Sequence, residues 1–209
     1  QSHHYQSLAF SSFISHEIEF ENQLMIKTGM RFEIFEQERI DRLIGARYQD
    51  KTTFVFLPGI GFNKKIGNIT LFGGLHRGFT PPSSGSIKIL NFGDNVNDGG
   101  LDLLAEKSWN KEIGIRTSSV EGNLDLEMAL FHVDIKNMVA AGRSIDFKNL
   151  GKIESMGLEM SSVLSIMQTS SLKPTLYLTY SFLHTNIKEA SIMSSINPSY
   201  YWTGAELNQ

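Results

Sequence analysis

The sequence predicts an all-β protein, an antiparallel up-and-down β-barrel that crosses a membrane. One unit occurs four times along the chain: a long alternating strand, a short polar turn, a second long strand and a long loop. Strands of soluble proteins typically run about five or six residues, whereas a membrane-crossing strand needs roughly nine to eleven, as the runs here do. Short turns on one side with long loops on the other are the layout of outer-membrane barrels.

The four turns are expected at nearly even spacing, near Glu21-Asn22, Lys64-Lys65, Glu121-Gly122 and Ser170-Ser171. Side chains alternate between the two faces of a strand, so each flanking strand should carry one apolar and one polar face. In the first hairpin the apolar positions are Leu8, Phe10, Ile14 and Ile18, then Leu24, Ile26, Met30, Phe32 and Ile34. Polar and charged residues fill the positions between them.

The later hairpins repeat this alternation. In the second hairpin it is blurred, because Val55 and Leu57 oppose a face that is already apolar. The apolar positions of the three hairpins are Phe54, Phe56, Ile60 and Phe62; Trp109, Ile113, Ile115, Leu124, Leu126, Met128 and Leu130; and Met156, Leu158, Met160, Leu164, Leu176, Leu178, Tyr180 and Phe182. This period of two excludes helices, whose apolar residues would recur every three or four positions.

The expected loops begin and end at Gln37 to Thr52, Gly78 to Leu104, Ala140 to Leu150 and Lys188 to Gln209, and they are rich in Gly, Asn, Asp and Ser. In this architecture the loops are extracellular. Lys111 breaks the pattern, since it falls on the lipid-facing side beside Trp109. Close to the outer rim its ammonium could reach lipid phosphates along its flexible stem.

Composition limits the function classes. The hydrophobic fraction of 41% excludes a disordered chain, and the formal charge of -3 comes from mixed acids and bases, with no basic patch for nucleic acid. There is no cysteine, which excludes disulfides and thiolate metal sites. The chain opens without a signal peptide and ends on a loop-like sequence, so we expect a fragment of a longer protein.

Two stretches go beyond the general pattern: residues 72–82, FGGLHRGFTPP, and residues 104–116, LAEKSWNKEIGIR. They resemble the barrel domain of TonB-dependent outer-membrane receptors, in particular the ferric-citrate-like siderophore branch. There, a strand ending Gly-x-x-(His/Tyr)-(Arg/Lys)-Gly-Phe-x-x-Pro enters a long outer loop, and a strand with Tyr-Glu-Leu-Gly-x-Arg follows. The resemblance covers most of residues 7–188, with Ala105 standing where Pro is usual and Lys111 where Tyr is usual.

The resemblance implies a barrel of about 22 strands with a plugged lumen, of which residues 1–209 would supply about eight strands and no plug. It also implies a non-enzymatic importer in the bacterial outer membrane. Its partners would be a ferric siderophore or other metal chelate, the TonB energy-coupling complex acting through the plug, and outer-membrane lipid. No cofactor or nucleic acid is expected.

Anionic iron chelates attract Arg and Lys, which supply charge and directed hydrogen-bond donors. The candidate ligand-binding residues are His76, Arg77, Lys107, Arg143 and Lys148. His76 and Arg77 are neighbours, and the alternation puts His76 inside. Arg77 is also explained as an interface anchor, and Arg143 and Lys148 as solvated loop charges.

Other clusters carry less. Glu112, Arg116, Glu127 and Glu159 fit an ion-pair ladder in a polar lumen. Val96 breaks the ligand spacing that a calcium loop would need in residues 94–100. No nucleophile elbow, phosphate loop or dinucleotide motif occurs, so we expect no catalytic residues and no metal site. His132 and Asp134 share one strand face and are interpreted as an interfacial polar pair.

Two alternatives stay open. A complete small eight-stranded barrel with a structural or adhesion role would pair its first and last strands. A soluble β-sandwich binding module would turn Leu126, Met128 and Leu130 toward a protein core.

Overall fold

The computed structural model describes residues 3–43, 45–49, 52–81, 104–119, 123–141, 147–166, 174–191, 201–202 and 205–206. Within these residues the chain forms strands and no helix. The strands are β1 (His3–Glu19), β2 (Leu24–Asp41), β3 (Ala46–Gln49), β4 (Thr53–Ile66), β5 (Ile69–Thr80), β6 (Glu106–Ser118), β7 (Leu124–Ala141), β8 (Phe147–Ser165), β9 (Thr175–Ser191), β10 (Tyr201–Trp202) and β11 (Ala205–Glu206). The described residues hold no helix that is long and apolar enough to cross a membrane.

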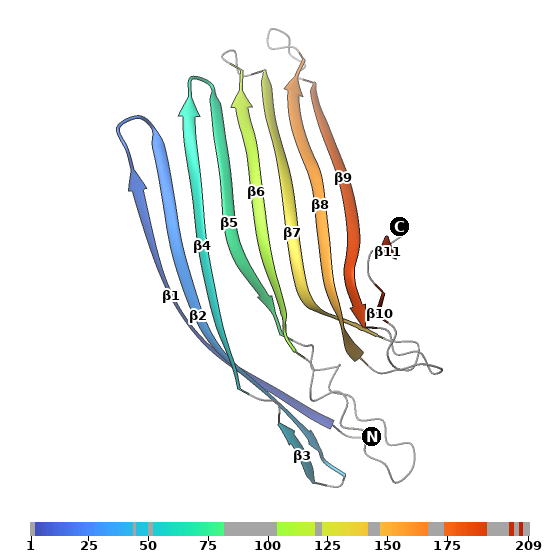
Figure 1. Cartoon of the computed structure of the whole chain (residues 1–209). Coiled ribbons are helices and arrows are strands. Elements are labelled where there is room, and N and C mark those ends of the chain that lie inside the picture. The colour runs from blue at the N-terminus through green and yellow to red at the C-terminus, as the bar shows by residue number, and fades with distance from the viewer. Residues whose placement is uncertain are drawn as a thin grey trace.

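All of the strands belong to one antiparallel sheet in the order β1-β2-β4-β5-β6-β7-β8-β9-β10, with β3 beside β2 and β11 beside β9. Each of the long strands pairs with the long strand that follows it in the sequence, which is the up-and-down arrangement (Figure 1). Eight strands are long, and they are the eight that the sequence predicts. Within the described residues β1 pairs only with β2, so the sheet is open and the pairing expected of a small closed barrel is not seen.

Cross-strand partners share a face, so the register fixes which side chains stand together. Phe32 of β2 stands opposite Phe56 of β4, with ring centroids 5.0 Å apart. Ile113 of β6 stands opposite Leu130 of β7. We call this the apolar face, and we call the other, which carries Lys27, Glu112 and Arg116, the polar face.

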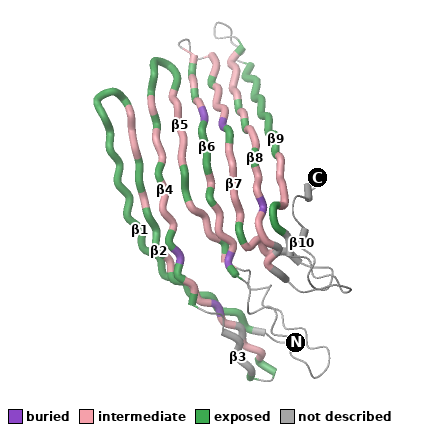
Figure 2. The backbone as a smooth tube through the Cα atoms, viewed as in Figure 1, coloured by how far each residue is buried: buried purple, intermediate pink, exposed green. Residues whose placement is uncertain are grey.

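The described strands form a single-layer sheet without a protein core. Among the described apolar side chains only Val55, Ala105, Ala129 and Ile153 are buried (Figure 2). Leu130 on the apolar face is 54% exposed. A sandwich would cover this face with a second sheet, so the sandwich alternative is wrong.

The second turn lies three residues beyond its predicted place. Lys64 and Lys65 remain in β4, opposite Leu71 and Thr70, and the Lys64 ammonium bonds the carbonyl of Asn22 in the neighbouring turn. The reversal falls on Gly67-Asn68, between the paired Ile66 and Ile69. Gly67 has φ of 60°, and two-residue type II′ hairpins take glycine at their first position because it reaches positive φ without a steric cost.

All four predicted loops are partly strand, and β5 itself runs to Thr80, into the loop predicted from Gly78. Residues 37–41 continue β2, and β3 then pairs back onto β2 from Asp41↔Ala46 to Glu38↔Gln49. β7 runs to Ala141, and β8 starts at Phe147. β9 runs to Ser191. The turn at Glu121-Gly122, the turn at Ser170-Ser171 and most of the loop from Gly78 to Leu104 lie outside the described residues, although the strands on both sides stand as expected.

Candidate functional site

The polar face carries ion pairs between neighbouring positions. Lys27 Nζ lies 3.6 Å from Glu17 Oε2, and Arg116 Nε donates to Glu127 Oε2 at 2.7 Å. The Arg116 guanidinium also lies over the Phe72 ring, 5.2 Å from its centroid. The ladder predicted around Arg116 is therefore present as one pair, which joins β6 to β7.

Two carboxylates of that predicted ladder stand apart from the pair. Glu112 and Glu159 make no ion pair with any described residue. They line one shallow recess of about 310 Å³ together with Glu127 and the hydroxyl side chains of β9. An acidic recess repels an anionic chelate, so this part of the wall suits contact with cationic groups rather than with such a ligand.

The candidate ligand-binding residues whose side chains the structure describes lie on both faces of the sheet. His76 pairs with Gly59 and Asn110 and lies on the polar face, as predicted. Arg77 pairs with Trp109, and Lys107 pairs with Phe79, so both lie on the apolar face at the end of the strands opposite the turns.

The other two candidates lie farther along the chain. Lys148 lies in β8 opposite Ala140, and Arg143 lies outside the described residues. Of the three candidates whose side chains the structure describes, His76 lies on the opposite face from Arg77 and Lys107, and the binding role of all five stays a prediction.

An amide clamp holds the end at which the long loop re-enters the sheet. Asn149 of β8 accepts from the Leu104 amide and donates to the Leu104 carbonyl, both at 2.8 Å, and also donates to the Asn137 carbonyl at 2.7 Å. Glu106 accepts from the Val139 amide at 2.7 Å. These bonds fix the start of β6 against β7 and β8.

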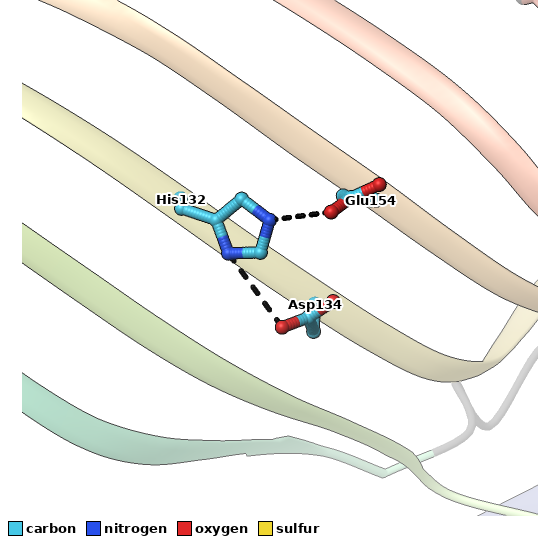
Figure 3. Close-up of side chains that lie close together, drawn as sticks. All are labelled: His132, Asp134 and Glu154. Atoms are coloured by element: carbon cyan, nitrogen blue, oxygen red, sulfur yellow. Dashed lines mark hydrogen bonds and ion pairs between the residues drawn. The ribbon is translucent and has the colours of Figure 1, made fainter.

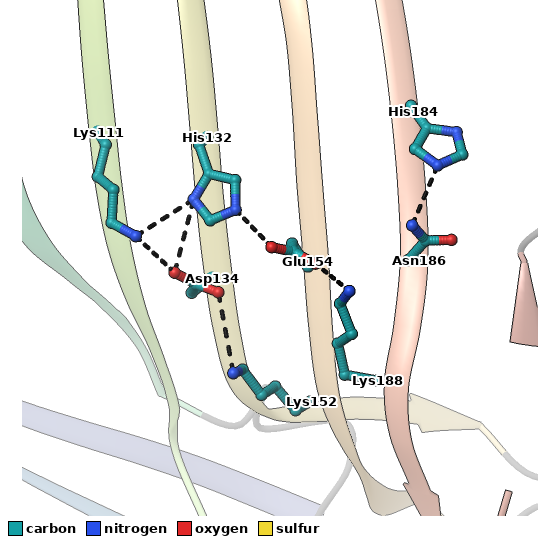
Figure 4. A network of polar contacts seen from close by, with 8 residues as sticks. All are labelled: Lys111, His132, Asp134, Lys152, Glu154, His184, Asn186 and Lys188. Atoms are coloured by element: carbon teal, nitrogen blue, oxygen red, sulfur yellow. Dashed lines mark hydrogen bonds and ion pairs between the residues drawn. The ribbon is translucent and has the colours of Figure 1, made fainter. Parts of the chain in front are cut away.

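The least expected cluster lies on the apolar face, where His132 bridges two carboxylates (Figure 3). His132 Nε2 lies 2.7 Å from Glu154 Oε1, and Nδ1 lies 3.6 Å from Asp134 Oδ2. Lys111 Nζ lies 3.0 Å from Asp134 and Lys188 Nζ lies 2.5 Å from Glu154 (Figure 4). The sequence indicated the His132–Asp134 pair, while Glu154 and Lys188 could be added only once the register was known.

This cluster is a poor metal centre, although its three ligand atoms lie within 4.8 Å of one another. Each nitrogen of His132 faces a different carboxylate, on opposite edges of the ring, so the three groups do not converge on one point. Each carboxylate is also neutralised by a lysine. A metal ion would have to displace both ammonium groups and bring Asp134 and Glu154 to the same nitrogen.

The comparisons with known proteins agree with this architecture. Residues 1–207 match the family model described as TonB dependent receptor-like, beta-barrel, so the chain belongs to that family. This membership places the chain in the bacterial outer membrane, and the family is one of receptors and transporters rather than enzymes. No curated protein matches the chain.

Solved structures with the same fold are distant in sequence. The ferric-catecholate import receptor Fiu from K12 E. coli superposes with a TM-score of 0.59 at 14% identity, over 89% of this chain and 33% of that one. The unliganded ferric citrate transporter FecA gives 0.66 at 18% identity, over 88% and 27%. The copper transporter OprC gives 0.67 at 14% identity, over 85% and 28%. The chain thus spans about a third or less of the length of these relatives.

Proposed function

We propose that the intact protein is a TonB-dependent importer of a metal chelate, with a ferric siderophore as the leading candidate ligand. The family match over residues 1–207 carries this proposal. The single sheet supports it, because an apolar outside and a charged inside are what a wall between lipid and a polar lumen requires. Residues 1–209 then form part of the barrel domain, with the plug and its coupling segment elsewhere in the intact protein.

The class of ligand follows from the neighbours and from charge. Ferric citrate, ferric catecholate and copper are named for the similar structures, and all three are metals or metal chelates. Glu112 and Glu159 leave the described polar face acidic, so an anionic chelate needs cationic contacts elsewhere. His76 at the rim, with Arg143 and Lys148 near the loop between β7 and β8, are the proposed contacts.

Uptake of radiolabelled iron tests the proposal in the intact protein. Iron-limited cells carrying or lacking the gene are given ⁵⁵Fe(III)-citrate or a ⁵⁵Fe-catecholate, with and without a protonophore. We expect accumulation of at least one probe to require the gene and to stop with the protonophore, because an importer driven through TonB needs the inner-membrane proton gradient. Equal accumulation with and without the gene for both probes and for ⁶⁴Cu, or gene-dependent uptake that the protonophore leaves unchanged, would overturn the proposal.

A further inference from the structure

The apolar face changes character abruptly along β6 to β9. Toward the turns its rows are apolar: Ile115, Met128, Met160 and Tyr180 stand side by side, followed by Ile113, Leu130, Leu158 and Phe182. The next three rows, toward the opposite end, are Lys111, His132, Met156 and His184; then Trp109, Asp134, Glu154 and Asn186; then Lys107, Lys136, Lys152 and Glu189. We call these last three rows, with Arg77 and Lys188 beside them, the rim belt; Figure 4 draws the part of it around His132.

The rim belt is basic. Arg77 and five lysines face three carboxylates, those of Asp134, Glu154 and Glu189. Asp134 and Glu154 are already engaged by Lys111, Lys188 and, at 4.0 Å, by Lys152. Arg77, Lys107 and Lys136 make no ion pair with a residue that the structure describes. The belt therefore presents cationic groups without an internal counter-charge.

Three of these cations stand in a single row. Lys107 of β6 is directly opposite Lys136 of β7, which is directly opposite Lys152 of β8. Like charges facing one another across strands destabilise a sheet. An external anion in front of this row would relieve the repulsion among the three ammonium groups. The carboxylates of the belt do not fill this position, so the row is suited to bind an anion from outside the protein.

The depth of the rim belt identifies the source of that anion. From Leu124 to Lys136 strand β7 covers twelve residue steps, about 40 Å along the strand at about 3.3 Å per residue. Because strands of a membrane barrel tilt by about 35–45°, this length corresponds to about 30 Å of height, whereas the outward apolar band is about 25 Å tall. With Leu124 at the turn end of the band, Asp134 lies at its opposite edge and Lys136 lies beyond it, at the level of the lipid headgroups. Trp109, 38% exposed within the belt, has the amphipathic ring that is enriched at this level.

We propose that the rim belt binds the phosphate groups of lipids in the outer leaflet. Lys107, Lys136 and Lys152 contact the phosphate, and Arg77 supports them with its fork of N–H donors. Asp134 and Glu154 hold Lys111, His132 and Lys188 in place on either side. This inference rests on the outer-membrane location and not on the proposed transport, so it stands whichever chelate the protein carries.

Lipid retention by the intact protein tests the site. The full-length protein is purified in a nonionic detergent and titrated with bis-phosphorylated lipid A, with binding read by native mass spectrometry. The variant is Lys107→Gln/Lys136→Gln/Lys152→Gln, and the matched control removes three cations from the polar face, Lys27→Gln/Arg31→Gln/Lys65→Gln. We expect the variant to bind about a hundredfold more weakly, since each lysine near an anionic surface contributes a factor of about five, and the control to bind as the unmodified protein does.

Two further arms make the result decisive. Dephosphorylated lipid A should not bind, and millimolar inorganic phosphate should not displace the bis-phosphorylated lipid. Equal lipid binding by the variant and the unmodified protein, equal binding of the dephosphorylated lipid, or displacement by inorganic phosphate would each overturn the proposal. Folding is checked by heat-modifiable migration in gels. Should the triple variant fail it, the Lys136→Gln single variant replaces it, with an expected loss of about fivefold against Lys27→Gln.

Discussion

Glycine and phenylalanine face each other across three strand pairs, and this pairing shapes the wall residue by residue. Phe72 stands opposite Gly114, Phe131 opposite Gly157, and Phe62 opposite Gly73. In each pair the ring lies over the glycine, so an added Cβ would meet it closer than 3.0 Å. Any side chain in place of these glycines would therefore collide with the phenylalanine ring opposite it.

Gly114→Ala should destabilise the barrel by about 1–3 kcal/mol, the usual cost of overpacking. The new methyl group would lie 2.5 Å from the Met128 carbonyl, which is backbone and cannot rotate away, and it would also strike the Phe72 ring. The urea midpoint of the intact protein in lipid vesicles measures the change. Gly29→Ala is the matched control, because its Cβ would lie 3.5 Å from the nearest atom, an ordinary contact. Equal midpoints for the two variants would contradict this account.

His76 and Arg77 are adjacent residues on opposite faces, so substitutions at the two positions distinguish contacts with the ligand from contacts with lipid. His76 lies on the polar face and Arg77 on the apolar face. We expect His76→Ala to raise the chelate concentration needed for half-maximal uptake severalfold, and Arg77→Ala to leave it unchanged. The readout is ⁵⁵Fe uptake by cells at equal receptor abundance. A larger effect from Arg77→Ala would mean that its side chain serves the ligand path.

The faces of individual residues could be predicted from the sequence, but their partners could not. Alternation places His76 inside and Lys111 outside without any knowledge of the neighbouring strands. Glu154 meets His132 only because β7 and β8 pair in one register, in which Asp134 faces Glu154. A shift by two residues would keep every side chain on its face and dissolve the cluster, so no single-strand pattern could have found it.

At the scale of strands, the register of β7 and β8 shifts twice near the rim, first between Lys136 and Met138 and again between Met138 and Val139. The pairing jumps from Lys136↔Lys152 to Met138↔Gly151, which leaves Asn137 out of the ladder with φ of 59°. A left-handed residue costs roughly 1–2 kcal/mol unless it is glycine or asparagine. Sequence alternation gave no sign of this bulge, because one unpaired residue does not disturb the pattern on either side of it.

Asn137→Ala should be less stable than Asn137→Gly by about 0.5–1 kcal/mol. Both substitutions remove the side-chain amide, so only the backbone term differs between them. Alanine carries the energetic cost of the left-handed conformation. Glycine avoids that cost, but the larger conformational entropy of its unfolded chain cancels part of the difference. Urea unfolding of both variants in lipid vesicles gives the difference directly. An alanine variant as stable as the glycine variant would show that the bulge relaxes to a right-handed conformation.

Strand bounds were predicted less well than strand faces. Turns were expected at polar residues, which explains the choice of Lys64-Lys65 over Gly67-Asn68. For the same reason the sequence predicts a loop at the polar end of β2, although residues 37–41 remain paired with β1. Beyond the apolar band a strand needs no apolar alternation, because both of its faces meet water or headgroups.

The apolar band ends sharply along β6, so the depth of this strand in the membrane can be tested with charged substitutions on one face. Ile113→Lys moves a charge two residues deeper than Lys111 on the same face, into the row of Leu130. We expect a loss of about 2–4 kcal/mol near the bilayer midplane, read as a lower urea midpoint in vesicles. Asn110→Lys puts the same side chain on the polar face and should cost little. An unchanged midpoint for Ile113→Lys would mean that this face does not meet hydrocarbon.

For the whole molecule, the open sheet decides between the readings that the sequence left open. A sandwich needs a second layer and a small barrel needs β1 against β9, and the described residues show neither. The resemblance implies that strands outside residues 1–209 close the barrel. Alternation of side chains cannot indicate this, because it is the same whatever the number of strands in the barrel.

The orientation of the wall gives the last prediction. Leu43, 70% exposed, lies in the turn between β2 and β3 at the rim, and exposed Asn68 lies in the turn between β4 and β5. If the end of the wall that carries the β4–β5 turn is periplasmic, the rim is extracellular. A membrane-impermeant maleimide given to whole cells should then label Leu43→Cys and not Asn68→Cys, while both react after lysis. This chain has no cysteine, so the unmodified protein serves as the background control. Labelling of Asn68→Cys alone in whole cells would invert the wall. The rim belt would then face the inner leaflet, and the lipid proposed for it would have to be a phospholipid of that leaflet.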